Sequence, residues 1–256
     1  MTAFPKQTTG STADVQTNGD TGLIKLVAFI TMAIDHIGYV FFPGEMWMRI
    51  IGRIAFPLFA YCLATGCIYT KNPKKYALRL FAFSVVSQPF YSLAFFPYYT
   101  EQLFDPINYG TAEAAIINIA ENLHLNIGFT MLLGFCAIQA IKSKKWLAFA
   151  AALAVSLWDG FEYSLYGVAL ILLMYIFCTK DAEIFGVVIG IALCIAFFDT
   201  PNYTFMGISL DAQGFGVLAL PFMLMHTKSG VKIPKLIGYG FYPLHIFIIY
   251  LAKLFI

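Results

Sequence analysis

The sequence predicts an all-α integral membrane protein, a polytopic bundle of about nine transmembrane helices with a cytoplasmic N-terminus and an external C-terminus. Composition is the first reason: 60% of the 256 residues are hydrophobic and only 12% are charged. A soluble domain has about a quarter of its residues charged, so we expect the lipid bilayer to be the main solvent. The second reason is the succession of long apolar stretches separated by short polar breaks.

The chain divides into a tail and one membrane domain. Residues 1–21 are rich in Thr, Ser and Gly and are expected to form a disordered cytoplasmic tail. Residues 22–256 are expected to form a single transmembrane domain. A span needs about 20 apolar residues to cross a hydrocarbon core of about 30 Å. The expected spans cover residues 23–43, 47–69, 75–96, 124–141, 145–159, 163–179, 182–198, 209–226 and 236–256.

Lys and Arg, which favour the cytoplasmic side of a membrane, set the orientation. With the N-terminus inside, the cytoplasmic breaks collect nearly all of the basic side chains, as at Lys71 and Lys142. The external loops hold acids, such as Glu101 and Asp105, and no Lys or Arg. A wrong number of spans would scramble this pattern.

The only long loop, residues 97–122, is predicted to be external. Its stretch 111–123 has apolar residues at helical spacing and is expected to lie along the membrane surface. Two interpretations stay open: a lid over an outward-facing site, or an interfacial helix that closes the bundle.

Ionisable residues occur inside two neighbouring spans, where they are costly and usually mark function. Asp35 and His36 lie in the first span, and Arg49 and Arg53 lie on one face of the second. Asp35, His36 and Arg53 reach similar depth on antiparallel helices, so we expect them to meet. Histidine transfers protons near neutrality, and arginine is a fixed donor for an oxyanion. The alternative is an Asp35–Arg53 ion pair that only locks two helices.

Other polar residues are candidates for substrate contact or support. His245 lies near the middle of the last span beside Tyr242, where Pro243 is expected to kink the helix around a cavity or in close packing. Asn126 lies near the outer start of the fourth span. Gln88 of the third span is expected to hydrogen-bond between helices, with substrate contact as the second interpretation.

Metal and nucleic-acid functions are not expected. The five cysteines lie within apolar runs, and their spacing fits no zinc or redox motif. The formal net charge of +2 is too small to indicate a nucleic-acid partner.

Several motifs resemble the TraX family of bacterial membrane proteins, in order along residues 23 to about 251. The first signature runs from residue 26 to residue 38 and contains the Asp-His pair. The second lies over 49–59, and the last over 242–245. One departure occurs at residues 162–164. The family tends to show Asp-Tyr-Gly there, and this chain has Glu162-Tyr163-Ser164.

The resemblance implies membrane-bound acyl transfer, because the family is named for N-acetylation of a conjugative pilin subunit. The Phe-Pro-Leu-Phe stretch is also similar to the wider membrane acyltransferase group, which includes acyltransferase family 3 and heparan glucosamine N-acetyltransferase. By this likeness His36 would be the catalytic histidine, with Arg49 and Arg53 as its intramembrane arginines. The acceptor would be an exported protein or a glycan, such as a pilin amine, at the bacterial cytoplasmic membrane.

Cytoplasmic acetyl-CoA would be the acyl donor by the same resemblance. The candidates for binding its phosphates are Lys71, Lys74, Lys75 and Lys142. The positive-inside rule explains these lysines equally well.

Two other functions compete with acyl transfer. A transporter or flippase would use Asp35, His36, Arg53 and Glu162 as a proton relay or to hold an anion. A non-catalytic assembly factor for a pilus or envelope complex would tolerate the loss of His36.

Overall fold

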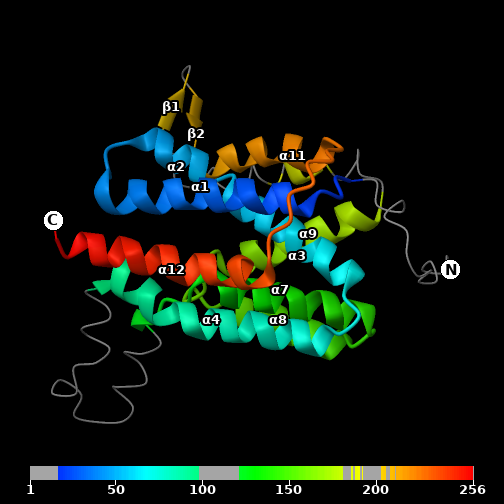
Figure 1. Cartoon of the computed structure of the whole chain (residues 1–256). Coiled ribbons are helices and arrows are strands. Elements are labelled where there is room, and N and C mark those ends of the chain that lie inside the picture. The colour runs from blue at the N-terminus through cyan, green and yellow to red at the C-terminus, as the bar shows by residue number, and fades with distance from the viewer. Residues whose placement is uncertain are drawn as a thin grey trace, which may run out of the picture.

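A computed structural model shows the chain as a bundle of helices with one short β-hairpin (Figure 1). It describes residues 17–97, 121–180, 186, 188–190, 192, 203–205, 208–210 and 212–255. The α-helices are α1 (Thr21–Phe41), α2 (Met46–Gly52), α3 (Ala55–Tyr69), α4 (Pro73–Phe95), α7 (Ile127–Lys142), α8 (Trp146–Ser156), α9 (Ser164–Thr179), α11 (Leu220–Leu224) and α12 (Lys235–Lys253).

Three segments are long and apolar enough to cross a membrane: Thr21–Phe41, Met46–Tyr69 and Lys235–Lys253. Several shorter apolar helices accompany them, among them α7, α8 and α9. Large apolar side chains also face outward, such as Leu147 at 85% exposure and Leu236 at 86%. Lipid accommodates such a surface and water does not. The helical membrane class agrees with the sequence prediction, whereas nine spans and the sidedness of the termini stay predictions.

The second expected span consists of two helices, α2 and α3, with a turn at Arg53 and Ile54. Pro57 explains the position of this turn. Proline has no backbone N–H to donate to the carbonyl four residues earlier, which here belongs to Arg53. The break therefore falls at the residue that carries the most deeply buried charge of the second span.

The expected span 209–226 is helical over Gln213–Leu224 but begins in a strand and is not one continuous α-helix. Strand β2 (Ile208–Leu210) pairs antiparallel with β1 (Tyr203–Phe205), and a 3₁₀ helix η2 (Ala212–Ala219) and the short α11 follow. Gly214 and Gly216 disfavour an α-helix here because glycine loses much backbone freedom on folding. The expected span 182–198 and the expected surface helix 111–123 fall mostly outside the described residues.

The last residues of the expected tail pack on the bundle. Asn18 is buried, its backbone N–H donates to the Met223 carbonyl at 2.8 Å, and its own carbonyl accepts from the Tyr61 hydroxyl at 2.6 Å. Asp20 then caps α1 by accepting from the Leu23 N–H. Residues 17–21 of the expected tail therefore belong to the folded bundle, which corrects the expected boundary at residue 21.

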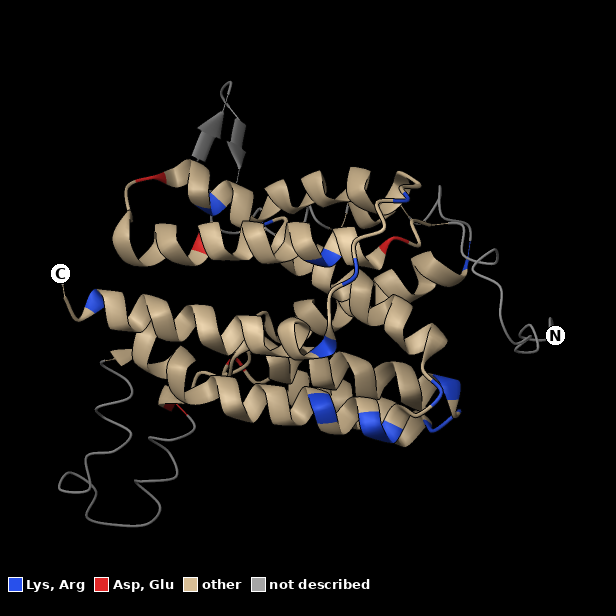
Figure 2. Ribbon diagram, viewed as in Figure 1, with Lys and Arg blue, Asp and Glu red and all other residues tan. Residues whose placement is uncertain are grey.

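Helix α3 is the centre of the bundle, and α1, α7 and α9 pack around it. Its side chains Leu58, Tyr61 and Leu63 are almost completely buried. Most Lys and Arg residues lie in the half of the molecule where α1 and α4 begin and α7 ends (Figure 2). The predicted orientation places this half at the cytoplasmic side.

Candidate functional site

A buried carboxylate joins two arginines where α1 packs against α2. Arg53 Nη2 lies 2.8 and 2.9 Å from the two carboxylate oxygens of Asp35. Arg49 Nη1 lies 2.9 Å from Asp35 Oδ1. The Arg53 side chain is 8% exposed, the Asp35 side chain 12% and the Arg49 side chain 27%. The expected meeting of Asp35 and Arg53 is present, and Arg49 joins it.

Gly52 makes this close approach possible. A Cβ atom at residue 52 would collide with the Asp35 side chain. Any larger residue at this position would push α2 away from the carboxylate or displace the carboxylate from its arginines.

Two histidines from opposite ends of the chain face each other. His36 of α1 and His245 of α12 stack with ring centroids 5.0 Å apart and an interplanar angle of 4°. His36 Nδ1 lies 2.7 Å from His245 Nε2, and His245 Nδ1 lies 2.8 Å from the Phe241 carbonyl oxygen. Both histidines were predicted from the sequence as candidate site residues, but their contact was not predicted.

These contacts fix the proton positions when both rings are neutral. A carbonyl oxygen only accepts, so His245 Nδ1 must carry a proton and donate it to Phe241. His245 Nε2 is then an acceptor, so His36 Nδ1 must be the donor. The remaining nitrogen of His36, Nε2, consequently carries a lone pair and is ready to accept a proton.

The histidine and the arginines face one cavity of about 420 Å³. It is lined by Asp35, His36, Tyr39, Arg49, Arg53, Tyr91, Phe95, Phe96, Glu162, Tyr163 and Gln213. We call it the outer cavity, after the side it faces in the predicted orientation. Five of the predicted site residues thus meet in one place.

Several aromatic residues of the outer cavity were missed from the sequence. The Tyr39 ring lies 5.0 Å from the Arg49 guanidinium carbon, and the Tyr163 hydroxyl lies 3.4 Å from Arg53 Nη1. Tyr39 is one turn beyond Asp35 on α1, so its helical spacing alone was a usable signal. For Tyr163, the only sequence signal was its position next to Glu162.

Glu162 lies in the connection between α8 and α9. Its Oε2 is buried with no hydrogen-bond partner among the described residues. Burial raises the pKa of Glu162 to about 7, and the nearby Arg53 guanidinium opposes this shift. The Thr130 hydroxyl donates to its backbone carbonyl and anchors the connection to α7. A carboxyl group with a pKa near neutrality can exchange protons there.

The connection has a strained backbone after Glu162. Tyr163 has φ 63° and Ser164 has φ 39°, both in the left-handed region that favours glycine. Glycine adopts this conformation without strain, so the glycine that the TraX resemblance implies at the position of Ser164 has a physical reason here.

Asn126 and Gln88 connect α7 with α4. Asn126 Nδ2 donates to Gln88 Oε1 at 2.9 Å and to the Ser84 carbonyl at 2.8 Å, and Gln88 Nε2 donates to the His124 carbonyl at 2.7 Å. Asn126 also caps α7. Neither side chain lines the outer cavity, which favours contact between helices over substrate contact for Gln88.

The four lysines proposed to bind phosphates also lie away from the outer cavity. Lys71, Lys74 and Lys75 are exposed at the start of α4. Lys142 Nζ donates to the Cys67 carbonyl at 2.8 Å at the end of α7.

Fold and site together define a helical membrane protein in which a half-buried histidine and a buried carboxylate–arginine cluster line one cavity. The chain matches the family model described as TraX protein over residues 20–253, and it belongs to that family. It is 26% identical over 248 residues to the probable fimbrial assembly protein FimC, serogroup H1, of Dichelobacter nodosus, covering 91% of this chain and 95% of the relative.

Another similar protein is Protein TraX of Escherichia coli, at 29% identity over 157 residues. This match covers 61% of the chain and 54% of the relative. No solved structure matches the chain.

Proposed function

We propose that this protein is a membrane acyltransferase that moves an acetyl or similar acyl group from acyl-CoA to an exported acceptor. The observation that carries the proposal is that His36, which His245 orients, lines one cavity together with Arg49. This arrangement supplies a proton acceptor and a fixed cation at one reacting centre. The names of the relatives, a fimbrial assembly protein and a TraX protein, favour a pilin amine as the acceptor over a glycan hydroxyl.

In the proposed reaction, His36 Nε2 takes the proton of the acceptor amine or hydroxyl as that group attacks the thioester carbonyl carbon. The carbon–sulfur bond then breaks, and the thiolate of CoA takes the proton from His36. An amide or ester forms, free CoA leaves, and the histidine returns to its neutral state. The step needs no other reactant.

His245 is a positioning residue in this proposal. Its Nε2 accepts from His36 Nδ1 and so keeps Nε2 of His36 unprotonated and correctly aimed. The same hydrogen bond strengthens when His36 becomes an imidazolium.

Arg53 and Arg49 have different roles in the proposed reaction. Arg53 is occupied, because it contacts Asp35, the Arg49 carbonyl and the Tyr163 hydroxyl. The described side-chain contacts of Arg49 with polar groups engage only Nη1. Arg49 therefore retains donors for the oxyanion of the tetrahedral intermediate, and Asp35 and Arg53 hold it in place.

The test is acyl transfer by the full chain in nanodiscs. We would follow CoA release and label transfer from radiolabelled acetyl-CoA to a peptide bearing a pilin-like amine and to a glycan. His36→Ala should lower the rate by at least about 100-fold, whereas His226→Ala, at an exposed residue, should not change it. Equal rates in wild type and His36→Ala would contradict the proposal. Flux of an unmodified substrate without acetyl-CoA binding would favour a transporter.

A further inference from the structure

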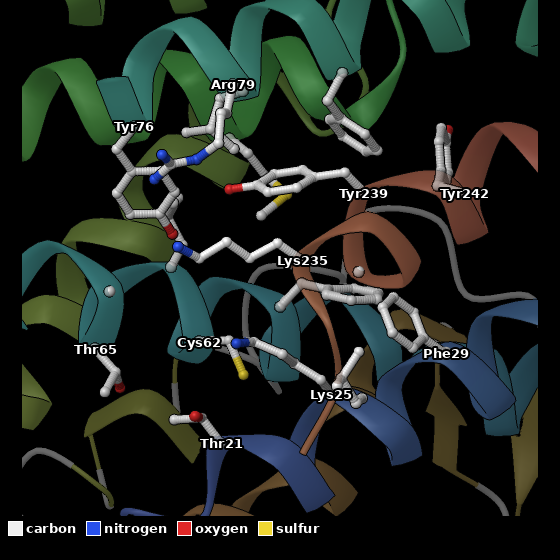
Figure 3. A pocket seen from close by; sticks show the side chains of 18 of the residues that line it. Thr21, Lys25, Phe29, Cys62, Thr65, Tyr76, Arg79, Lys235, Tyr239 and Tyr242 are labelled. Atoms are coloured by element: carbon white, nitrogen blue, oxygen red, sulfur yellow. The ribbon is translucent and has the colours of Figure 1, made fainter. Parts of the chain in front are cut away.

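A second cavity, of about 430 Å³, lies between α1, α3, α4 and α12 and is lined by none of the charged residues of the outer cavity. We call it the inner cavity (Figure 3). Lys25 precedes His36 by eleven residues on α1, about 16 Å along the helix axis. Lys235 precedes His245 by ten residues on α12, about 15 Å. Two separate helices thus place Lys25 and Lys235 at similar distances, about 16 and 15 Å, from His36 and His245.

Three cations from three helices converge on the inner cavity. Figure 3 shows the side chains of Lys25 of α1, Arg79 of α4 and Lys235 of α12 pointing into it. Within the described part of the chain, the ion pairs join Asp35 with Arg49 and Arg53 and do not include these three residues. No carboxylate is among the described residues that line this cavity.

Arg79 shows the lack of an internal partner most clearly. Its Nε is buried and has no hydrogen-bond partner among the described residues. The guanidinium carbon lies 5.5 Å from the centre of the Tyr76 ring, which fixes the group without satisfying its N–H donors. A buried donor left without a partner costs free energy, and converging cations repel each other. An anion from outside the chain would relieve both costs.

The remaining wall is suited to a long, mainly apolar arm. It includes Phe29, Met32, Phe83 and Tyr239. It also includes Tyr242, whose buried hydroxyl has no hydrogen-bond partner in the described structure and whose ring centroid lies 6.1 Å from that of His36. Tyr242 therefore stands between the inner cavity and the catalytic histidine, and its hydroxyl is available to a polar group on the arm.

We propose that the inner cavity binds the acyl donor, with Lys25, Arg79 and Lys235 on its phosphates and the acyl-bearing arm along the aromatic wall to Tyr242. This assignment rests on the proposed function and replaces the exposed lysines of α4 with residues that line a cavity. Guanidinium and ammonium groups bind phosphate oxygens through charge-assisted hydrogen bonds. A phospholipid headgroup offers the same chemistry, a phosphate with an apolar chain, so the experiment must separate the two sources.

The test measures binding of radiolabelled acetyl-CoA to the full chain in nanodiscs of zwitterionic lipid. Lys25→Gln, Arg79→Gln and Lys235→Gln should each raise the Kd by about tenfold or more, because each removes a charged hydrogen bond. Lys74→Gln, at an exposed lysine outside the cavity, is the matched control and should leave the Kd unchanged. Lys235→Arg should retain most of the affinity.

Acetyl-pantetheine, which has the arm but no phosphate, makes the test independent of folding. The three Gln variants should bind it as wild type does, whereas a misfolded variant would lose both ligands. If Arg79→Gln is misfolded, Arg79→Lys takes its place. If wild type binds acetyl-CoA and the Gln variants bind it equally well, the inner cavity is not the donor site. Loss of phosphatidylglycerol binding in those variants would then assign the cavity to lipid. If wild type binds no acetyl-CoA, the proposed function itself fails.

Discussion

The two cavities differ in how their charges are satisfied. At the outer cavity, Asp35 neutralises Arg49 and Arg53 within the protein. At the inner cavity, Lys25, Arg79 and Lys235 have no acidic partner in the described structure. Internal pairing holds groups in position for chemistry, whereas unpaired cations favour an external anion. The difference indicates that the outer cavity is preorganised and that the inner cavity is completed by its ligand.

Asp35→Asn should have the largest effect. It removes the ion-pair partner of the buried Arg53 and of the half-buried Arg49, and loss of one partner of a buried pair typically costs about 3–5 kcal/mol. We expect a much lower melting temperature in detergent and a poor yield of folded protein. Asp159→Asn, at an exposed residue, is the control. If Asp35→Asn and Asp159→Asn had the same melting temperature, the ion pairs of Asp35 would not be what stabilises the outer cavity.

Gly52→Ala tests the close approach of α2 to the carboxylate. The added methyl group collides with Asp35, and overpacking of this kind costs about 1–3 kcal/mol. Gly240→Ala is a matched control in α12, where a Cβ meets nothing within 4 Å. Thermal unfolding of both variants gives the comparison. Equal stability would show that α2 has room to move.

His245→Phe separates positioning from binding. Phenylalanine keeps a planar ring but removes the acceptor for His36 Nδ1. We expect kcat to fall by about tenfold and the KM for acetyl-CoA to stay the same. The pH profile should also shift, because His36 would lose the bond that stabilises its imidazolium. An unchanged kcat would contradict the assigned proton positions.

The smallest effect concerns Glu162 and pH. The folded-state pKa of about 7 lies above the ordinary value of 4.5. Between these values the folded state binds more protons than the unfolded state, so stability should fall as pH rises through this window. We expect a gradual loss of at most about 1.4 kcal/mol per pH unit, since a single proton is involved, and it is measured by thermal unfolding at pH 4.5 to 8. Glu162→Gln should flatten the profile; a variant profile as steep as that of wild type would place the titrating group elsewhere.

Much of the outer site could be predicted because depth in a membrane follows from residue counts. Asp35 and Arg53 meet where the lengths of two consecutive spans place them. The contact between His36 and His245 could not be predicted in this way, since it depends on the first and last helices being neighbours in the bundle. Residue spacing carries no information on that arrangement.

Local glycine and proline effects and side-chain direction also limited the prediction. The glycines of η2 interrupt a segment that hydropathy alone presents as one span. The bias of Lys and Arg to one side identifies a basic end of the bundle. It does not distinguish Lys71, which is exposed, from Arg79, which lines a cavity.

The most direct test of the account compares binding and turnover of acetyl-CoA in the same nanodisc samples. His36→Ala should bind acetyl-CoA with the Kd of wild type and release CoA at least about 100-fold more slowly. Arg79→Gln should bind about tenfold more weakly and keep its kcat at saturating donor. This crossed pattern is the result that we predict. Variants that lost binding and turnover together would contradict the division of the protein into a donor-binding cavity and a catalytic one.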